Sequence, residues 1–207
     1  MKTIYRTCLL LMLAIAMQHS AMAQNTDANL LRFINLHRNK GLDNAMAGIS
    51  NSAYPVAVAV PVAELAFGFI DRRMKMREIG LETAEMAIAN LIIVTGLKYG
   101  INRTRPYDVY PELQPYSRDS DPSCPSGTTS FAFNTATALS MHYQRWYVTA
   151  PAFAWAATVG YSRIHLGEHY PTDVFWGAVV GVGSAWLVQK GNAWLRHRHN
   201  QYLMVEP

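Results

Sequence analysis

Five apolar runs of helical length follow one another along the chain, at residues 54–70, 83–97, 127–141, 148–161 and 174–189. Each run is rich in Ala, Gly and Val, and none shows the alternation of apolar and polar residues that is typical of a half-buried strand. A shorter amphipathic pattern begins near residue 29. The chain therefore predicts an all-α fold, a bundle of about five core helices plus a short N-terminal amphipathic helix. That first helix would lie on a membrane or cover one end of the bundle.

The first 23 residues have the pattern of a secretory signal peptide. Two basic residues precede an apolar run at 9–17, and Ala21–Ala23 places small residues at the two positions that a signal peptidase reads. The apolar run is too short to span a bilayer, which disfavours the alternative of a retained anchor. We expect residues 1–23 to be removed on export to the cell envelope, and residues 24–207 to form a single domain.

Composition places the chain between a soluble helical domain and a small membrane protein. Half of its residues are hydrophobic, only 15% are charged, and its mean hydropathy is zero. Without the signal peptide, 16 Lys and Arg residues stand against 14 Asp and Glu residues, so the net charge is only +2. This value argues against a nucleic-acid partner. Cys124 would be the only remaining cysteine, which excludes an internal disulfide.

The densest group of reactive side chains lies at residues 162–173, which read S-R-I-H-L-G-E-H-Y-P-T-D. Pro171 suits the first position of a helix, so Asp173 would lie in the first turn, close to His169. A carboxylate there accepts the N–H of one imidazole nitrogen and leaves the lone pair of the other free to attack an electrophile. Arg163 offers a fork of donors for phosphoryl oxygens. The alternative is a surface loop in which His169 is an ordinary hydrogen-bonded residue.

A second group of cations follows the run at 83–97. Pro106 disfavours helix at Arg105, so we expect Lys98 at the end of a helix and Arg105 on an extended turn beyond it. An ammonium and a guanidinium can there converge on one phosphate group, which gains charge in its transition state. Arg103 adds a third cation whose direction the sequence does not assign. The alternative is a basic helix terminus that offsets its own dipole.

The third group is a helix start. Ser126 is predicted to cap the run at 127–141, and the free N–H groups of such an end bind anions. Gly127 would let the backbone approach the anion closely. Alone, this is an ordinary helix start, but in an up-and-down bundle it shares one end with the other two groups.

Charge divides the two ends of the predicted bundle. The end opposite the reactive groups collects basic residues, namely Arg72, Arg73, Lys75, Arg77, Arg145, Lys190, Arg196 and Arg198. The loop at 107–124, at the reactive end, is mainly acidic. By the positive-inside rule, the reactive end would face the periplasm.

The sequence alone allows two interpretations of the apolar runs, as membrane-spanning helices or as the core helices of a soluble protein, and it favours the first. The apolar runs contain 14 to 17 residues, fewer than the ~20 that usually span a bilayer. They also contain polar residues, including Glu64, Asn90 and Asn134.

Together these groups resemble the signature of the type 2 phosphatidic-acid phosphatase superfamily. That signature is Lys, six residues, Arg-Pro; then Pro-Ser-Gly-His; then Ser-Arg, five residues, His, three residues, Asp. The first and third blocks match in full and the middle block in three of four positions, and the similarity runs from about residue 29 to residue 190. The family includes lipid phosphatases, bacterial acid phosphatases and vanadium haloperoxidases, and the resemblance implies a helical bundle that needs no metal or other cofactor.

The resemblance also implies roles for individual residues. His169 would be the nucleophile that forms a phosphohistidine, and Asp173 would orient it. The phosphate would be held by Lys98, Arg105, Ser126, Gly127 and Arg163.

The middle block departs from the signature at one position. Thr128 stands where the family has the histidine that protonates the leaving oxygen. A threonine hydroxyl is a poor general acid near neutral pH, whereas imidazole titrates near ~6.5. His165 is our first candidate for a replacement donor, and the alternative is that it is a packing residue. Without a replacement, catalysis would be weakened or the protein would only bind anions.

We therefore expect an envelope phosphatase that acts on a lipid-linked phosphate or diphosphate at a membrane. The segment L-G-E-H-Y-P-T-D-V is similar to the lipid-phosphatase branch of the family. A soluble periplasmic phosphomonoesterase of broad specificity and a catalytically weakened anion-binding relative are the alternatives. The missing histidine also predicts a preference for leaving groups that are stable anions, as in diphosphates and anomeric sugar phosphates.

Overall fold

The computed structural model describes residues 25–203, so the predicted signal peptide lies outside the described residues. Within that range the regular structure is entirely helical, as predicted. The described part of the chain begins with a helix at residues 25–36. The elements that follow are η1 (Lys40–Leu42), α2 (Asp43–Asn51), α3 (Ala53–Ile70), α4 (Met74–Ile101), α5 (Pro106–Val109), α6 (Gly127–Tyr143), α7 (Trp146–His165) and α8 (Pro171–Leu203).

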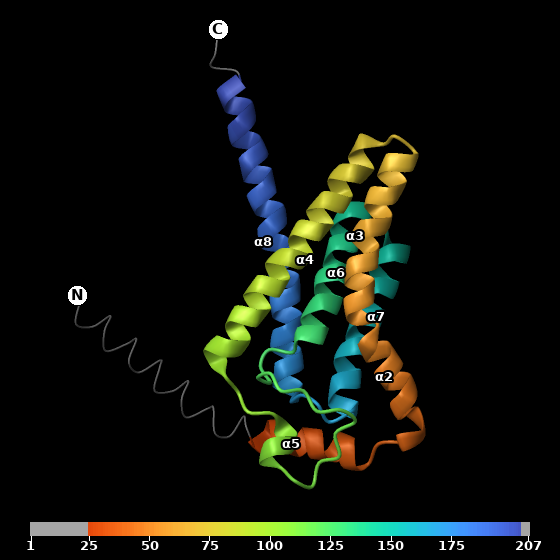
Figure 1. Cartoon of the computed structure of the whole chain (residues 1–207), viewed down its shortest axis with the longest axis vertical. Coiled ribbons are helices and arrows are strands. Elements are labelled where there is room, and N and C mark those ends of the chain that lie inside the picture. Colours follow the sequence, from red (N-terminus) through yellow and green to blue (C-terminus); the bar gives the residue numbers. More distant parts are fainter. Residues whose placement is uncertain (1–24, 204–207) are drawn as a thin grey trace, which may run out of the picture.

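The long helices form an up-and-down bundle around α6 (Figure 1). Helix α6 contacts α3, α4, α7 and α8, and most of its residues are buried. The turn between α3 and α4 lies at one end of the bundle, together with the C-terminal part of α8. The helix at 25–36 and α5 lie across the other end, where the loops after α5 and α7 also meet. The first helix therefore covers an end of the bundle, one of the two placements predicted for it.

Close packing of α8 against α6 depends on two glycines. A Cβ atom added at Gly181 would lie 2.3 Å from the carbonyl oxygen of Ser130, and one added at Gly177 would lie 2.6 Å from that of Ser126. Any larger residue would force the two backbones apart. The beginning of α8, which follows the reactive loop, is thereby held directly against the beginning of α6.

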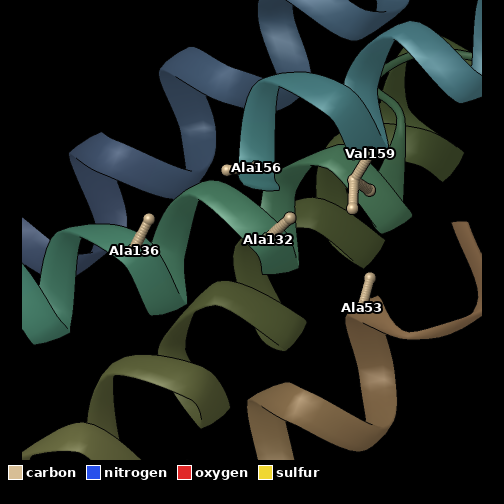
Figure 2. Packing of buried hydrophobic residues seen from close by; sticks show 5 residues of the cluster. All are labelled: Ala53, Ala132, Ala136, Ala156 and Val159. Carbon is tan, nitrogen blue, oxygen red and sulfur yellow. The ribbon is translucent and has the colours of Figure 1, made fainter. Parts of the chain in front are cut away.

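Small residues also fill the centre of the bundle (Figure 2). Ala53 of α3, Ala132 and Ala136 of α6, and Ala156 and Val159 of α7 form one fully buried cluster. Large apolar side chains lie instead on the outer surfaces of α3, α4 and α8, and include Val58, Val62, Phe67, Ile88, Ile92, Phe175, Trp186 and Leu187. This inverted distribution is typical of helices that are surrounded by lipid, because small residues let helices approach and lipid solvates the large ones.

The helices are longer than the apolar runs that predicted them. Helix α4 has 28 residues against 15 in its run, because the helix continues through polar residues at both ends. At 1.5 Å per residue it is about 42 Å long. Three segments, Lys40–Ile70, Met74–Val109 and Pro171–Arg198, are long and apolar enough to cross a membrane. These three segments are therefore longer than the apolar runs within them and support the favoured membrane interpretation, whereas α6 has only 17 residues.

Glu64, Asn90 and Asn134, three polar residues within the apolar runs, are turned inward and make hydrogen bonds, whereas Glu85 is exposed. The side-chain oxygen of Asn90 accepts hydrogen bonds from Ser130 (2.6 Å) and Ser184 (3.0 Å). The amide of Asn134 donates to Ser184 (3.0 Å), and Glu64 accepts from Tyr143 (3.2 Å). Polar residues at membrane depth are tolerated when they face the bundle interior in this way, so they do not argue against membrane spans.

Candidate active site

The end of α4 carries the first two cations as predicted. Lys98 is buried in the last turn, and Asn102 ends the helix in the left-handed conformation, with φ of 50°. Arg105 follows in an extended conformation immediately before Pro106, which begins α5. The ammonium of Lys98 and the guanidinium of Arg105 both reach the Asp121 carboxylate, the first at 2.6 Å. The two cations therefore converge on one anion.

Ser126 caps α6, also as predicted. Its side-chain oxygen accepts a hydrogen bond from the backbone N–H of Thr129 at 3.4 Å. Its own N–H donates to the carbonyl of Asp173 at 3.0 Å, which joins the start of α6 to the start of α8. A Cβ atom at Gly127 would lie 3.0 Å from the hydroxyl of Tyr54 and 3.6 Å from Cε of Lys98. A glycine is therefore needed for these side chains to approach the backbone.

His169 lies in the turn between α7 and α8, and its surroundings determine which nitrogen is free. Nδ1 lies 3.5 Å from Oδ2 of Asp173 in the first turn of α8, and 3.4 Å from the hydroxyl of Ser123. Nε2 lies 3.3 Å from Nη1 of Arg105, which can only donate. These partners assign the proton to Nδ1 and the lone pair to Nε2, the arrangement of a nucleophilic imidazole.

The pKa of His169 also favours the neutral form. Burial lowers the pKa of His169, the hydrogen bond with Asp173 opposes this, and the positive charges of Arg163 and Arg105 lower it further, to about 4. The imidazole is therefore neutral at pH 7, with its Nε2 lone pair directed to the side where the cations lie.

These groups surround a cavity of about 420 Å³ at the loop end of the bundle. It is lined by Ser50, Asn51, Tyr54, Lys98, Arg105, Ser117, Asp119, Asp121, Gly127, Thr128, Arg163 and His169. Six of the nine predicted site residues are among them. The structure thus brings together side chains from α2, α3, α4, α6, α7 and three loops, and the cavity is large enough for a phosphate or diphosphate group.

Two carboxylates from the loop before α6 pair with the cations of the cavity. Asp119 lies 3.1 Å from both Arg105 and Arg163, and Asp121 pairs with Lys98 and Arg105. Burial raises the pKa of Asp121, but hydrogen bonds and charges from Lys98 and Arg105 outweigh this and lower it.

A third carboxylate, Glu168, is buried against Arg163 and accepts a hydrogen bond from Ser117 at 2.7 Å. The cations Lys98, Arg105 and Arg163 therefore face three carboxylates, those of Asp119, Asp121 and Glu168.

Three of the predicted residues lie outside the cavity. Ser126 and Asp173 are fully buried behind Gly127 and His169, where they cap a helix and orient the imidazole. His165 lies 3.1 Å from Asp43, which is itself held by Arg38 at 2.9 Å. The prediction that His165 replaces the missing proton donor is not supported by this geometry, because its ring is turned to the α2 side of α7.

Arg103, which the sequence left unassigned, lies behind His169 and not in the cavity. Its guanidinium donates to Asp173 at 2.6 Å and to Asp27 of the first helix at 2.8 Å, and it lies over the ring of Tyr170. Asp27 also accepts from the backbone N–H of Thr172 at 2.9 Å. The first helix is thereby tied to the loop that carries His169.

Asp27, Tyr54, Asp119, Asp121 and Ser123 also belong to the site, and the sequence did not predict them. The sequence of the loop at 107–124 indicates only its net charge, and nothing in the local pattern marks Tyr54 or Asp27 as site residues.

The fold and the site together define a helical-bundle protein with a phosphate-sized, cation-lined cavity and a buried histidine beside an aspartate. The chain belongs to the PAP2 superfamily, whose sequence profile matches residues 80–196. This confirms the resemblance drawn from the motifs.

Two characterised relatives are 27% identical to the chain. One is the undecaprenyl-diphosphatase of Sulfolobus acidocaldarius, aligned over 84% of this chain and 82% of the relative. The other is the undecaprenyl-diphosphatase BcrC of Bacillus subtilis, aligned over 70% of this chain and 72% of the relative.

Two crystal structures have the same fold. Aquifex aeolicus LpxE matches with a TM-score of 0.64 and 31% identity, over 78% of this chain and 93% of that one. A transmembrane PAP2-type phosphatidylglycerolphosphate phosphatase from Bacillus subtilis matches with a TM-score of 0.69 and 24% identity, over 86% of this chain and 90% of that one. The chain therefore spans most of the length of its relatives.

Proposed function

We propose that the protein is a membrane-integrated phosphatase that removes phosphate from a lipid-linked phosphate or diphosphate. The observation that carries this proposal is the position of the cavity. Cations and His169 gather at the end of a bundle whose outer surfaces carry large exposed apolar side chains along three helices of membrane-spanning length. A phosphate group at the membrane surface would reach the cavity while its lipid remains in the bilayer. The undecaprenyl-diphosphatases among the relatives act on a substrate of this kind.

In the proposed reaction, Nε2 of His169 attacks phosphorus and the bond from phosphorus to the leaving oxygen breaks, which gives a phosphohistidine. Lys98, Arg105 and Arg163 neutralise the charge on the phosphoryl oxygens, and Asp173 stabilises the imidazolium that forms. Water then attacks phosphorus, the P–N bond breaks, and free phosphate and neutral His169 result. The three cations supply the charge stabilisation that a metal supplies in other phosphatases, so we expect activity in the presence of EDTA.

Phosphate release by protein purified in detergent would test this function. The substrates are a polyprenyl diphosphate, a polyprenyl monophosphate, a phosphatidic acid and a soluble sugar phosphate, with His169→Ala as the control. We expect release from the lipids, an acid-labile phosphoenzyme, and loss of both in His169→Ala. A wild-type protein that releases phosphate from none of them would overturn the proposal and favour an anion-binding relative, whereas release from the sugar phosphate alone would favour a broad-specificity phosphomonoesterase.

The orientation of the site is a second part of the proposal. Arg72, Arg73, Lys75 and Arg77 lie at or beside the turn between α3 and α4, at the end of the bundle away from the cavity. Basic residues are retained on the cytoplasmic side, so the cavity would face the periplasm. Reporter fusions after Arg77 and after Asp121 should then report the cytoplasm and the periplasm respectively. A periplasmic signal from both would contradict a membrane-spanning bundle.

A further inference from the structure

The proposed reaction needs a proton donor that no motif residue supplies. An alkoxide leaving group is a strong base, and its departure is typically accelerated 10²- to 10⁴-fold by a group that protonates it. Thr128 lines the cavity but has an aliphatic hydroxyl, and His165 is turned toward Asp43. Lys98 is held by Asp121 and by the carbonyl of Pro122, at 2.6 and 2.7 Å.

Among the remaining cavity residues, Tyr54 is the strongest neutral acid. A phenol titrates near ~10, below the aliphatic hydroxyls of Ser50, Ser117 and Thr128, and it carries its proton at neutral pH. It is therefore the best donor that the lining offers.

The position of the Tyr54 hydroxyl fits this role. The Tyr54 hydroxyl lies against Gly127, 3.0 Å from the position that a Cβ atom would occupy there. Cε of Lys98 lies 3.6 Å from the same position. The Tyr54 hydroxyl thus borders the same backbone N–H groups at the start of α6 that are placed to hold a phosphoryl oxygen. It also interacts with the side chain of Thr128, the position at which the family signature has its histidine.

The ring of Tyr54 packs against a neighbouring helix, while the residue is only partly buried. It packs against Phe131 of α6 with a centroid distance of 5.0 Å, and it occupies the first turn of α3, one of the three helices of membrane-spanning length. About half of the residue is exposed. A lipid leaving group that departs from the cavity toward the bilayer would pass this helix end, whereas His169 approaches from the loop between α7 and α8.

We infer that the Tyr54 hydroxyl donates the proton to the leaving-group oxygen, in the role that an imidazole at position 128 would otherwise have. This inference rests on the proposed function. As Nε2 of His169 bonds to phosphorus, the P–O bond breaks and the Tyr54 proton moves to the departing oxygen. In the second step the tyrosinate accepts a proton from the attacking water, whose oxygen bonds to phosphorus as the P–N bond breaks. Both groups return to their starting states.

The variant Tyr54→Phe tests this, because it removes only the hydroxyl and keeps the ring on Phe131. We would measure kcat/KM, which covers the steps up to leaving-group departure, for nitrophenyl phosphate, phenyl phosphate and an alkyl phosphate. The expected loss is 10²- to 10⁴-fold for the alkyl ester and less than about tenfold for the nitrophenyl ester, whose leaving group is a stable anion. Tyr147→Phe, at the start of α7 and far from the cavity, is the matched control.

A rescue experiment separates proton donation from a structural role. In the Tyr54→Phe background, Thr128→His should restore alkyl-phosphate hydrolysis by at least tenfold and leave the nitrophenyl ester nearly unchanged. An equal loss for all three esters, or no loss, would overturn the assignment of Tyr54 while the proposed function stands. A wild-type protein with no activity on any phosphate would overturn both.

Discussion

Replacing Asp119 and Asp121 by Asn should make the protein bind phosphate more tightly. Both carboxylates occupy the positions around Lys98, Arg105 and Arg163 that a phosphate dianion would take, and together they carry the same charge of −2. The phosphate group of the substrate must therefore displace these two carboxylates or bind despite their repulsion. Replacement of the two carboxylates by a phosphate dianion leaves the net charge of the site unchanged, so neither has a large electrostatic advantage. The free energy of the carboxylate contacts is therefore lost when phosphate binds, which weakens its binding.

The size of the effect follows from the number and exposure of these contacts. Four ion pairs join the two carboxylates to the cations, and the carboxylate side chains are 40% and 42% exposed. At about 0.5 kcal/mol for each partly exposed pair, the four contribute about 2 kcal/mol. Because asparagine keeps part of the hydrogen bonding, we expect the competitive inhibition constant of inorganic phosphate to fall by about tenfold in the double variant, or roughly 1.4 kcal/mol.

The assay is inhibition of substrate hydrolysis by inorganic phosphate at fixed pH and ionic strength. Asp108→Asn is the matched control, since Asp108 is also an aspartate near this end of the bundle but its partner, Arg118, is 3.9 Å away and exposed. It should leave the inhibition constant unchanged. An unchanged or higher constant in the double variant would show that the carboxylates organise the cations for phosphate instead of competing with it.

Three further results are expected. Arg103→Gln should lower kcat by at least about 10²-fold and lower the melting temperature, because it leaves buried carboxylates unpaired, whereas Arg118→Gln should do neither. In the proposed reaction neutral His169 attacks, so kcat/KM should fall only as the pH drops toward its pKa of about 4. An acid limb near 6.5 that persists after correction for substrate ionisation would contradict the environment assigned to His169. Gly181→Val should destabilise the bundle by at least ~1–3 kcal/mol in thermal unfolding, while Gly183→Val, which meets no atom within 4 Å, should not.

The parts of the site that follow from local chemistry could be predicted from the sequence. The end of α4 before Arg105, the Ser126 cap and the start of α8 at Pro171 each depend on a few neighbouring residues, and the structure has all three. The lengths of the helices were underestimated, because helices continue through polar residues that break an apolar run.

Contacts between distant parts of the chain could not be predicted in this way. Asp27 is 76 residues from Arg103 and 145 from Thr172, and these contacts depend on how the first helix lies across the bundle. The direction of Arg103 is decided by Asn102, whose left-handed conformation turns the chain so that Arg103 and Arg105 point to different sides of His169. Tyr54 reaches the cavity only because α3 packs beside the start of α6.

The two sides of His169 carry opposite charge, and in the proposed reaction this gives a role to the second carboxylate behind it. On the cavity side, Arg105 lies beside Nε2 and disfavours a proton there. On the other side, Asp173 and Asp27 carry two negative charges against the single positive charge of Arg103. One net negative charge therefore remains beside Nδ1, which matches the imidazolium that the proposed phosphohistidine would form. With Asp173 alone, Arg103 would cancel that charge, and Asp27 restores it. In the proposed reaction the first helix therefore contributes to catalysis as well as to the fold.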